Sequence, residues 1–286
     1  MGILNNIIAA VDTSAMADEV LKRAISLAAR ESAQVTVLHN IETPLFEKLF
    51  GDVAGEEKLR KKLEEKMNAL NSEAKVDFFV TITRGKASDE IVYEADKLQS
   101  ELIIIGAHGK KSIKDTFFGS TAHHVAQKSH LPVLIIKKPV TDDYKNVLAL
   151  TDLSEASQKS IQFAQNLFKD AKLDISYAYT QITDLSVDFY NLESERDDFR
   201  EKVRERTEQD VEKFQQSLGI DNTEVIEGFE PISEMLLETA EDHEPDLVIL
   251  GTHGVKVSDT VVYGSTASYL MKKVPSDILI YVPLEK

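Results

Sequence analysis

The sequence predicts an α/β protein made of two repeated, doubly wound domains that pack as a pseudo-dimer. Each domain is expected to be a five-stranded, mainly parallel sheet with helices on both faces. Three observations predict this fold. The second half of the 286-residue chain repeats the first half, short apolar runs alternate with amphipathic segments, and one glycine pattern follows the fourth apolar run of each half.

The first half begins with an apolar run, followed by an amphipathic helix whose apolar face carries Val20, Ala24, Leu27 and Ala28. A second apolar run precedes a long charged segment, which we interpret as a peripheral helix with a solvated face. A third run, a helix with Ile91 on its apolar face, and a fourth run follow. The fifth run comes after a glycine loop and a short helix. The segments that hold these runs begin with "NNIIAAV", "QVTVLHNIE", "VTITRG", "LIII" and "VLIIKK".

The second half has the same elements in the same order. "NNIIAAVDTS" matches "KNVLALTDLS", so Asp12 corresponds to Asp152, and "LPVLIIKKPV" matches "PSDILIYVPL". Runs rich in Val, Ile and Leu without polar alternation are typical of buried parallel strands. We expect the domains to span residues 1–140 and 141–286, with the boundary in the polar segment that contains Pro139. The apolar last strand of each domain has an edge that needs covering, and pairing of the two would form the pseudo-dimer.

The glycine pattern reads "GAHGKKSIKDTFFGST" at 106–121 and "GTHGVKVSDTVVYGST" at 251–266. Glycine at the carboxyl end of a strand allows a sharp turn and a close approach of the backbone to a ligand. The last glycine precedes a helix, so Ser120 and Ser265 fall at helix N-termini, which favour anions. The spacing therefore indicates a phosphate site in at least one half. The alternative is that the glycines only form turns and the serines only cap helices. The pattern is not a P-loop, because its last glycine is followed by Ser-Thr, where a P-loop has a lysine and then Ser or Thr.

These motifs, together with the repeat, resemble the universal stress protein family (UspA-like) in its tandem two-domain form, over nearly the whole chain. The resemblance implies an adenine nucleotide alpha hydrolase-like fold and ATP binding. It implies that Asp12 and Asp152 contact the nucleoside, and that Asn40 and Thr180, after the second strand, border the base. The glycine loops and their neighbours would hold ribose and phosphates. The implied nucleotide-binding residues are Val11, Asp12, Thr13, Asn40, Ile105, Gly106, His108, Gly109, Gly119, Ser120 and Thr121 in the first half, and Asp152, Thr180, Leu250, Gly251, His253, Gly254, Gly264, Ser265 and Thr266 in the second.

Several of these residues have a second interpretation. Asp12 and Asp152 are equally suited to capping the following helix. His108 and His253 have no nearby nucleophile or carboxylate partner in the sequence, so we expect them to line the site rather than to act as bases. His123 and His124 are adjacent on a helix and point about 100° apart, which disfavours a shared metal. No catalytic residue and no protein-bound metal is expected, although Mg²⁺ is an ordinary companion of ATP.

Composition restricts the classes of function. A formal net charge of -16 disfavours nucleic-acid binding, and no apolar run reaches the roughly 20 residues that span a bilayer. The chain contains no cysteine, so disulfides and thiol chemistry are excluded, and the start of the sequence does not resemble a signal peptide. We therefore expect a cytoplasmic protein with an adenine nucleotide as ligand and a protein partner that the sequence does not identify. A homodimer of the whole chain stays open.

The expected function is nucleotide-dependent regulation in the stress response, without strong catalysis. The alternatives are a slow ATPase or nucleotidyl-transfer enzyme, and a scaffold or small-ligand binder that does not use nucleotides. We expect the first site to bind ATP more tightly. Its loop carries Lys110, Lys111 and Lys114 against Asp115, whereas Lys256 and Asp259 cancel in the second loop.

Overall fold

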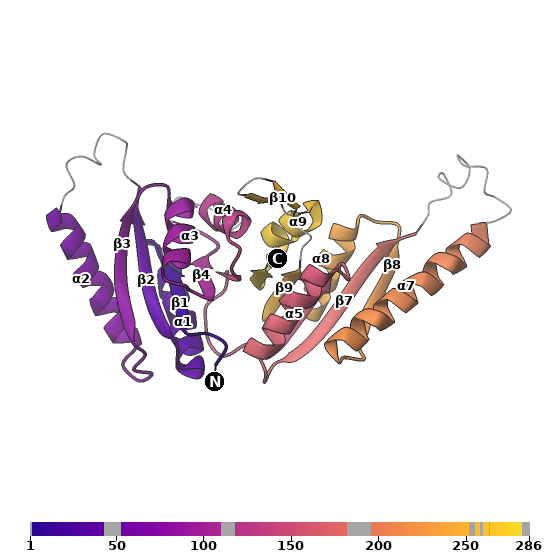
Figure 1. Ribbon diagram of the computed structural model, residues 1–286, viewed down its shortest axis with the longest axis horizontal. Coiled ribbons are helices and arrows are strands. Elements are labelled where there is room, and N and C mark those ends of the chain that lie inside the picture. Colours follow the sequence, from indigo (N-terminus) through magenta and orange to yellow (C-terminus); the bar gives the residue numbers. More distant parts are fainter. Residues whose placement is uncertain are drawn as a thin grey trace. The chain divides into compact units, whose positions relative to one another are not determined.

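The structure is a computed structural model that describes residues 2–42, 53–109, 118–181, 196–251, 255–257, 260–262 and 264–281. The chain divides into two compact units (Figure 1). Unit 1 comprises Met1–Asp143, Val255–Val262 and Asp277–Lys286, and unit 2 comprises Tyr144–Gly254 and Tyr263–Ser276.

The strands of unit 1 are ordered β3-β2-β1-β4-β5-β12. The first five run parallel to one another, and β12 pairs antiparallel with β5, with Leu279 opposite Leu134. The second repeat thus contributes its last strand to the sheet of unit 1, along the strand edge that the sequence predicts to need covering. The strand bounds are β1 Asn6–Ala10, β2 Gln34–Ile41, β3 Phe78–Arg84, β4 Leu102–Gly106, β5 Val133–Ile136 and β12 Asp277–Tyr281.

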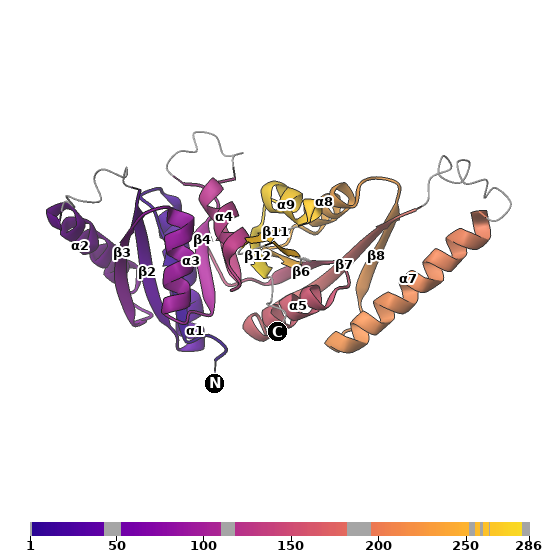
Figure 2. The same cartoon turned by 45° about the horizontal axis from the view of Figure 1, so that its top comes forward.

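The helices of unit 1 cover both faces of its sheet. Helix α1 contacts α2, and α3 contacts α4, as expected when the chain winds outward from β1 on one face and back to β5 on the other. Figures 1 and 2 show α2 beside β3 and α3 over the strands. The predicted apolar face of α1 is fully buried. The helix bounds are α1 Met16–Glu31, α2 Val53–Leu70, α3 Ala87–Lys97 and α4 Ser120–Lys128.

Unit 2 repeats this arrangement with strands in the order β9-β6-β7-β8, all parallel, as the register pairs show. Figure 2 shows α8 and α9 together on one side of these strands and α5 on the other, and α5 contacts α7. The bounds are β6 Asn146–Thr151, α5 Glu155–Leu167, β7 Lys172–Thr180, α7 Arg196–Leu218, β8 Thr223–Gly228, α8 Ile232–His243, β9 Leu247–Gly251 and α9 Ser265–Lys273.

The central strands explain why the sheets form. The apolar residues of β1, β4 and β9 are buried on both faces, which matches their uninterrupted Ile, Leu and Val content. The outer strands β3 and β8 are only partly buried, and their sequences are more polar or aromatic. The predicted mainly parallel α/β fold is therefore confirmed.

One element was not predicted. In the second glycine loop, β10 (Val255–Val257) pairs antiparallel with β11 (Thr260–Val262). Its two runs have only three residues each, and Ser-Asp between them is not one of the dipeptides typical of a two-residue hairpin loop, so the sequence carries only a weak signal for this element.

Candidate functional site

In unit 1, the candidate site lies at the carboxyl ends of β1 and β4. These strands are neighbours in register, with Ala10 opposite Ile105, so Asp12 and Gly106 leave the sheet from adjacent strands. In parallel sheets this edge, where successive connections diverge to opposite faces, is the usual place for a ligand. Val11 and Ile105 are buried beneath the edge, whereas Thr13 is exposed.

Asp12 is held in a defined orientation by the turn that follows β1. Its Oδ1 accepts hydrogen bonds from the backbone N–H of Ser14, at 2.8 Å, and from the Ser14 hydroxyl. Helix α1 has Ala15 as its N-cap, with no side-chain capping bond. Asp12 therefore forms a local turn and does not cap the helix.

The second carboxylate oxygen of Asp12 faces the glycine loop. A Cβ added at Gly109 would lie 3.1 Å from Asp12 Oδ2. The far end of the loop also returns to this place, because the Gly119 N–H donates to the Ala107 carbonyl at 2.7 Å. The structure thus brings Asp12, Gly109 and Gly119 together, as the sequence predicts.

The glycines of this loop are required for space and not for unusual backbone angles. Among the described glycines, positive φ occurs only at Gly85 and Gly219, so Gly106, Gly109 and Gly119 do not depend on the access of glycine to positive φ. A Cβ at Gly106 would lie 2.6 Å from Met16 Cγ, and one at Gly119 would lie 2.9 Å from the Ala107 carbonyl oxygen. A side chain at either position would collide with its neighbour.

Helix α4 begins at this loop, and no side chain among the described residues caps its first backbone N–H groups. Its N-cap is Gly119, which offers no side-chain acceptor, and no acidic residue lies in its first turn. Ser120 is exposed and Thr121 is half-buried. An uncapped N-terminus with hydroxyl groups beside it is suited to an anion.

The opposite side of the site is formed by β2. Asn40 lies within this strand rather than after it, and its amide is engaged: it donates to the Gly85 carbonyl and accepts from Thr83 Oγ1, both at 3.0 Å. The preceding His39 is buried, and its Nδ1 lies 2.8 Å from the Val11 carbonyl oxygen. His108 is half-buried in the glycine loop.

The equivalent site of unit 2 has the same skeleton. Asp152 Oδ1 accepts from the Ser154 N–H at 3.0 Å, and Ser154 is the N-cap of α5, accepting from Ser157 N. Asp152 is exposed, and Leu250 is buried below it on β9. His253 and Gly254 lie outside the described residues.

Two differences separate this site from that of unit 1. A Cβ at Gly251 would lie 2.6 Å from Ser157 Oγ and 2.7 Å from Ser157 Cβ, and still closer to Ser157 Cα, so this glycine allows α5 to pack on β9. Around Gly264, by contrast, no described atom lies within 4 Å of an added Cβ. Ser265 is exposed and Thr266 is half-buried at the start of α9, which has no side-chain cap.

Asn40 and Thr180 do not occupy equivalent positions. Register pairs place Leu38 opposite Ala10 and Ser176 opposite Leu150, so Asn40 corresponds to Ala178 and His39 to Tyr177. Burial, followed by the charges of Asp210 and Asp152, raises the pKa of Tyr177. The sequence reasoning missed His39 and Tyr177, although their matched places in "VTVLHN" and "DISYAY" were available.

Lys137 was also missed. It follows β5, its Nζ lies 5.5 Å from the centre of the Phe118 ring, and its backbone N–H donates to Asp277 Oδ1 at 2.7 Å. Burial lowers the pKa of Lys137 to about 7, and the Asp277 charge opposes this shift. The loop residues Lys110, Lys111, Lys114, Asp115 and Asp259 and the side chain of Lys256 lie outside the described part of the chain.

The described residues contain no group of three or more His, Asp or Glu side chains placed to bind a metal ion. The His123 and His124 rings are 5.9 Å apart with their planes inclined by 57°. Within the same residues, no helix combines the length and apolarity that crossing a bilayer requires.

Known proteins resemble this chain in both sequence and fold. The profile of the universal stress protein family matches residues 4–137 and again 143–282. Universal stress protein MJ0577 of Methanocaldococcus jannaschii is 32% identical over 148 residues, covering 44% of this chain and 91% of the relative. Universal stress protein MJ0531 of the same organism is 29% identical over 143 residues, covering 48% of this chain and 84% of the relative.

Solved structures extend the likeness to the whole chain. A universal stress protein from Archaeoglobus fulgidus superposes with a TM-score of 0.67 at 20% identity, covering 97% of this chain and 98% of that structure. A functionally unknown protein from Pseudomonas aeruginosa gives a TM-score of 0.70 at 17% identity, covering 98% and 93%. These identities support the fold alone. Because the family profile matches each half separately and together nearly the whole length, the chain belongs to the universal stress protein family and carries the family's domain twice.

Proposed function

We propose that the protein binds ATP at the glycine-loop edge of each repeat, and that nucleotide occupancy regulates its contacts with other proteins. The observation that carries this proposal is the convergence in unit 1 of Asp12 Oδ2, Gly109 and the uncapped start of α4 at Gly119. A carboxylate acceptor and a helix N-terminus at one sheet edge match the two ends of a nucleotide, its hydroxyl or amine donors and its phosphates.

Each group has a separate role in this proposal. Asp12 accepts hydrogen bonds from ribose hydroxyls or the adenine amine, and Ser14 keeps its carboxylate in place. The first amides of α4, with Ser120 and Thr121, bind phosphate oxygens. Gly109 leaves the space between these groups empty. Asp152, Gly264 and Ser265 take the corresponding roles in unit 2. Mg²⁺ bound to the phosphates would add positive charge there.

The residues of the site favour ATP binding over rapid ATP hydrolysis. The glycine motif contains no lysine at the place where a P-loop has one. His108 is half-buried in the glycine loop, and we expect it to line the site rather than to act as a base. The main alternative is slow ATP hydrolysis, which would release phosphate in the samples used for titration.

Calorimetric titration of ATP, with Mg²⁺ present and absent, tests the proposal on the full-length protein. Gly109→Ala and Gly109→Val form a graded series at the first site, because each adds volume toward Asp12 Oδ2. We expect valine to abolish binding at that site and alanine to weaken it. The Gly109→Val/Gly254→Val variant should bind no ATP. Circular dichroism spectra that match the wild type would show that the fold is intact.

Unchanged ATP affinity in the folded double variant would refute the site. Phosphate release above a protein-free control in the same samples would favour the slow ATPase. Absence of ATP binding in the wild type would leave a scaffold or a different ligand as the function.

A further inference from the structure

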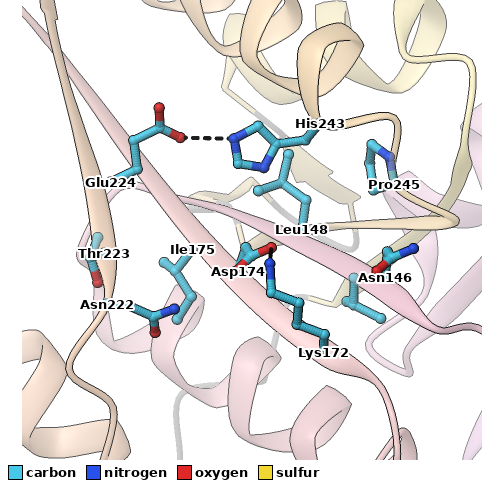
Figure 3. Close-up of a pocket in the computed structure, with 11 residues that line it drawn as sticks. Asn146, Leu148, Lys172, Asp174, Ile175, Asn222, Thr223, Glu224, His243 and Pro245 are labelled. Atoms are coloured by element: carbon cyan, nitrogen blue, oxygen red, sulfur yellow. Dashed lines mark hydrogen bonds and ion pairs between the residues drawn. The ribbon is translucent and has the colours of Figure 1, made fainter.

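Unit 2 has a hollow at the opposite end of its strands from the glycine loop. It lies at the amino ends of β6, β7 and β8 and has a volume of about 490 Å³ (Figure 3). Small-molecule sites commonly have volumes of about 300 to 1,000 Å³. From Leu148, which lines the hollow, to Asp152 the chain extends over roughly 13 Å, so the hollow is separate from the glycine-loop site.

The charged side chains that the strands contribute to the hollow come from one face of the sheet. Asn146 pairs in register with Lys172, Leu148 with Asp174, and Ser176 with Glu224. Since alternate residues of a strand share a face, these side chains point to the same side. Helix α8 contacts β6 and β7, and it ends there with His243 (Figure 3).

Two carboxylates in the hollow are held in place by their neighbours. Lys172 Nζ donates to Asp174 Oδ2 at 2.7 Å. Glu224 Oε2 accepts from Ser176 Oγ at 2.9 Å and lies 3.2 Å from His243 Nε2. For the other two oxygens, Asp174 Oδ1 and Glu224 Oε1, no partner is found among the described residues. Each carboxylate therefore keeps an acceptor for a ligand.

The electrostatic field in the hollow favours a cation. Among the lysine and acidic side chains that line it, Lys172 stands against Asp174 and Glu224, which leaves one net negative formal charge. The C-terminus of α8 adds the negative end of a helix dipole, with Glu244 as its left-handed C-cap. A protonated amine would satisfy the free acceptors and this field together.

Unit 1 provides an internal comparison, because the same place in its fold lacks these charges. Register pairs make Gln34 the counterpart of Lys172, Thr36 that of Asp174, and Thr81 that of Glu224. Leu98, four residues before β4, stands where His243 stands before β9. The fold therefore does not require charges at these positions.

By contrast, both units have a carboxylate at this edge that accepts hydrogen bonds from the backbone N–H groups of the first strand. Glu101 Oε2 accepts from the N–H groups of Asn5 and Asn6, and Asp246 Oδ2 accepts from those of Lys145 and Asn146. The carboxylate that anchors the first strand is thus common to both units, whereas Asp174 and Glu224 are particular to unit 2. This contrast separates a structural carboxylate from one that is available to a ligand.

We propose that the hollow at the amino ends of β6, β7 and β8 binds a small organic cation through a protonated amine, with Asp174 and Glu224 as its acceptors. The site is independent of the nucleotide sites proposed above. It is present in unit 2 and replaced by neutral residues in unit 1.

Calorimetric titration of the full-length protein with putrescine tests the proposal. Butanediol and succinate, with the same four-carbon length, serve as neutral and anionic comparisons. Asp174→Thr/Glu224→Thr introduces the residues that unit 1 has at these positions, and threonine suits a strand. Asp174→Asn and Glu224→Gln provide milder changes if the double variant does not fold. Glu227→Gln is the matched control, because it removes one carboxylate from the opposite face of β8.

We expect putrescine to bind the wild type and Glu227→Gln equally. Each single pocket variant should bind about ten-fold more weakly, the size of effect typical of a lost charge-assisted hydrogen bond. The resonances of His243 should shift on titration. Lack of putrescine binding to the folded wild type, equal binding of butanediol, or equal loss in Glu227→Gln would each overturn the proposal.

Discussion

The substitution of Gly251 by alanine tests whether the motif glycines are needed for packing or for the ligand. The added Cβ would lie 2.6 Å from Ser157 Oγ, 2.7 Å from Ser157 Cβ and still closer to Ser157 Cα. Carbon atoms in contact prefer about 3.5 to 4.0 Å, so α5 has to move away from β9. Because part of the clash is with the helix backbone, no rotamer change relieves it.

Overpacking of this kind costs about 1 to 3 kcal/mol, and a backbone clash belongs at the upper end. A loss near 3 kcal/mol corresponds to a fall in Tm of roughly 10 °C for a unit of this size. Gly106→Ala is the matched control in unit 1, because the close contacts of its Cβ would be with the flexible Met16 side chain, 2.6 Å from Cγ and 3.4 Å from Cβ, while the His108 carbonyl oxygen lies at an ordinary contact distance of 3.6 Å. We expect that variant to lose less than about 1 kcal/mol.

Differential scanning calorimetry and hydrogen exchange resolved by segment would measure both effects. Exchange should increase in α5 and β9 of Gly251→Ala and stay unchanged in β1 and β4. Ser157→Gly in the Gly251→Ala background should recover stability only in part, since it removes the contacts with Cβ and Oγ but not the one with Cα. The packing argument is wrong if Gly251→Ala melts like the wild type, or if Gly106→Ala is the more damaging change.

Three further predictions concern the sites. Gly264→Ala should change Tm by no more than about 2 °C, because no described atom lies within 4 Å of the added Cβ. The same substitution should weaken ATP binding to unit 2, and an unchanged affinity would show that Gly264 is not part of the site. Asp12→Asn keeps an acceptor for Ser14 but loses the charge, so ATP affinity should fall about ten-fold with little change in stability, as calorimetry and thermal melts would show. Lys137→Met should raise Tm near pH 7 and below, because burial destabilises the charged lysine in the folded state. As the pH rises from about 7 toward the ordinary lysine pKa of 10.5, this destabilisation disappears, so the difference in Tm between the variant and the wild type should vanish. An advantage that persists at pH 10 would contradict this account.

The sequence was informative wherever a local pattern determines the structure. Uninterrupted apolar runs predicted the buried strands, and the helical period predicted the buried face of α1. The convergence of Asp12 with the glycine loop followed from strand order, since carboxyl ends of neighbouring parallel strands meet at one edge. These features depend on periodicity and topology, which the repeat shows twice.

The sequence was less informative where side chains from distant segments meet. The contact of Gly106 with Met16 and that of Gly251 with Ser157 depend on how closely α1 and α5 approach the sheet, which no short pattern encodes. The charged hollow of unit 2 joins residues of three strands and a helix end. The sequence paired Asn40 with Thr180, whereas the strand register pairs Asn40 with Ala178. The end of a strand carries no pattern that fixes the register between the two repeats.

The first turn of the helix after each Asp would make the two proposed nucleotide sites unequal, independently of the loop lysines. In unit 1 the wall beside Gly106 is the Met16 side chain, which has three rotatable bonds and can change its shape. In unit 2 the wall beside Gly251 is the backbone of α5 at Ser157, whose hydroxyl lies 2.6 Å from that of the buried Thr151. A ligand that needs more room at the strand ends can displace Met16, whereas in unit 2 it would have to move α5 as a whole. The site of unit 1 is therefore the more adaptable of the two, and a preference of ATP for that site would follow from this difference even if every loop lysine pointed into solvent.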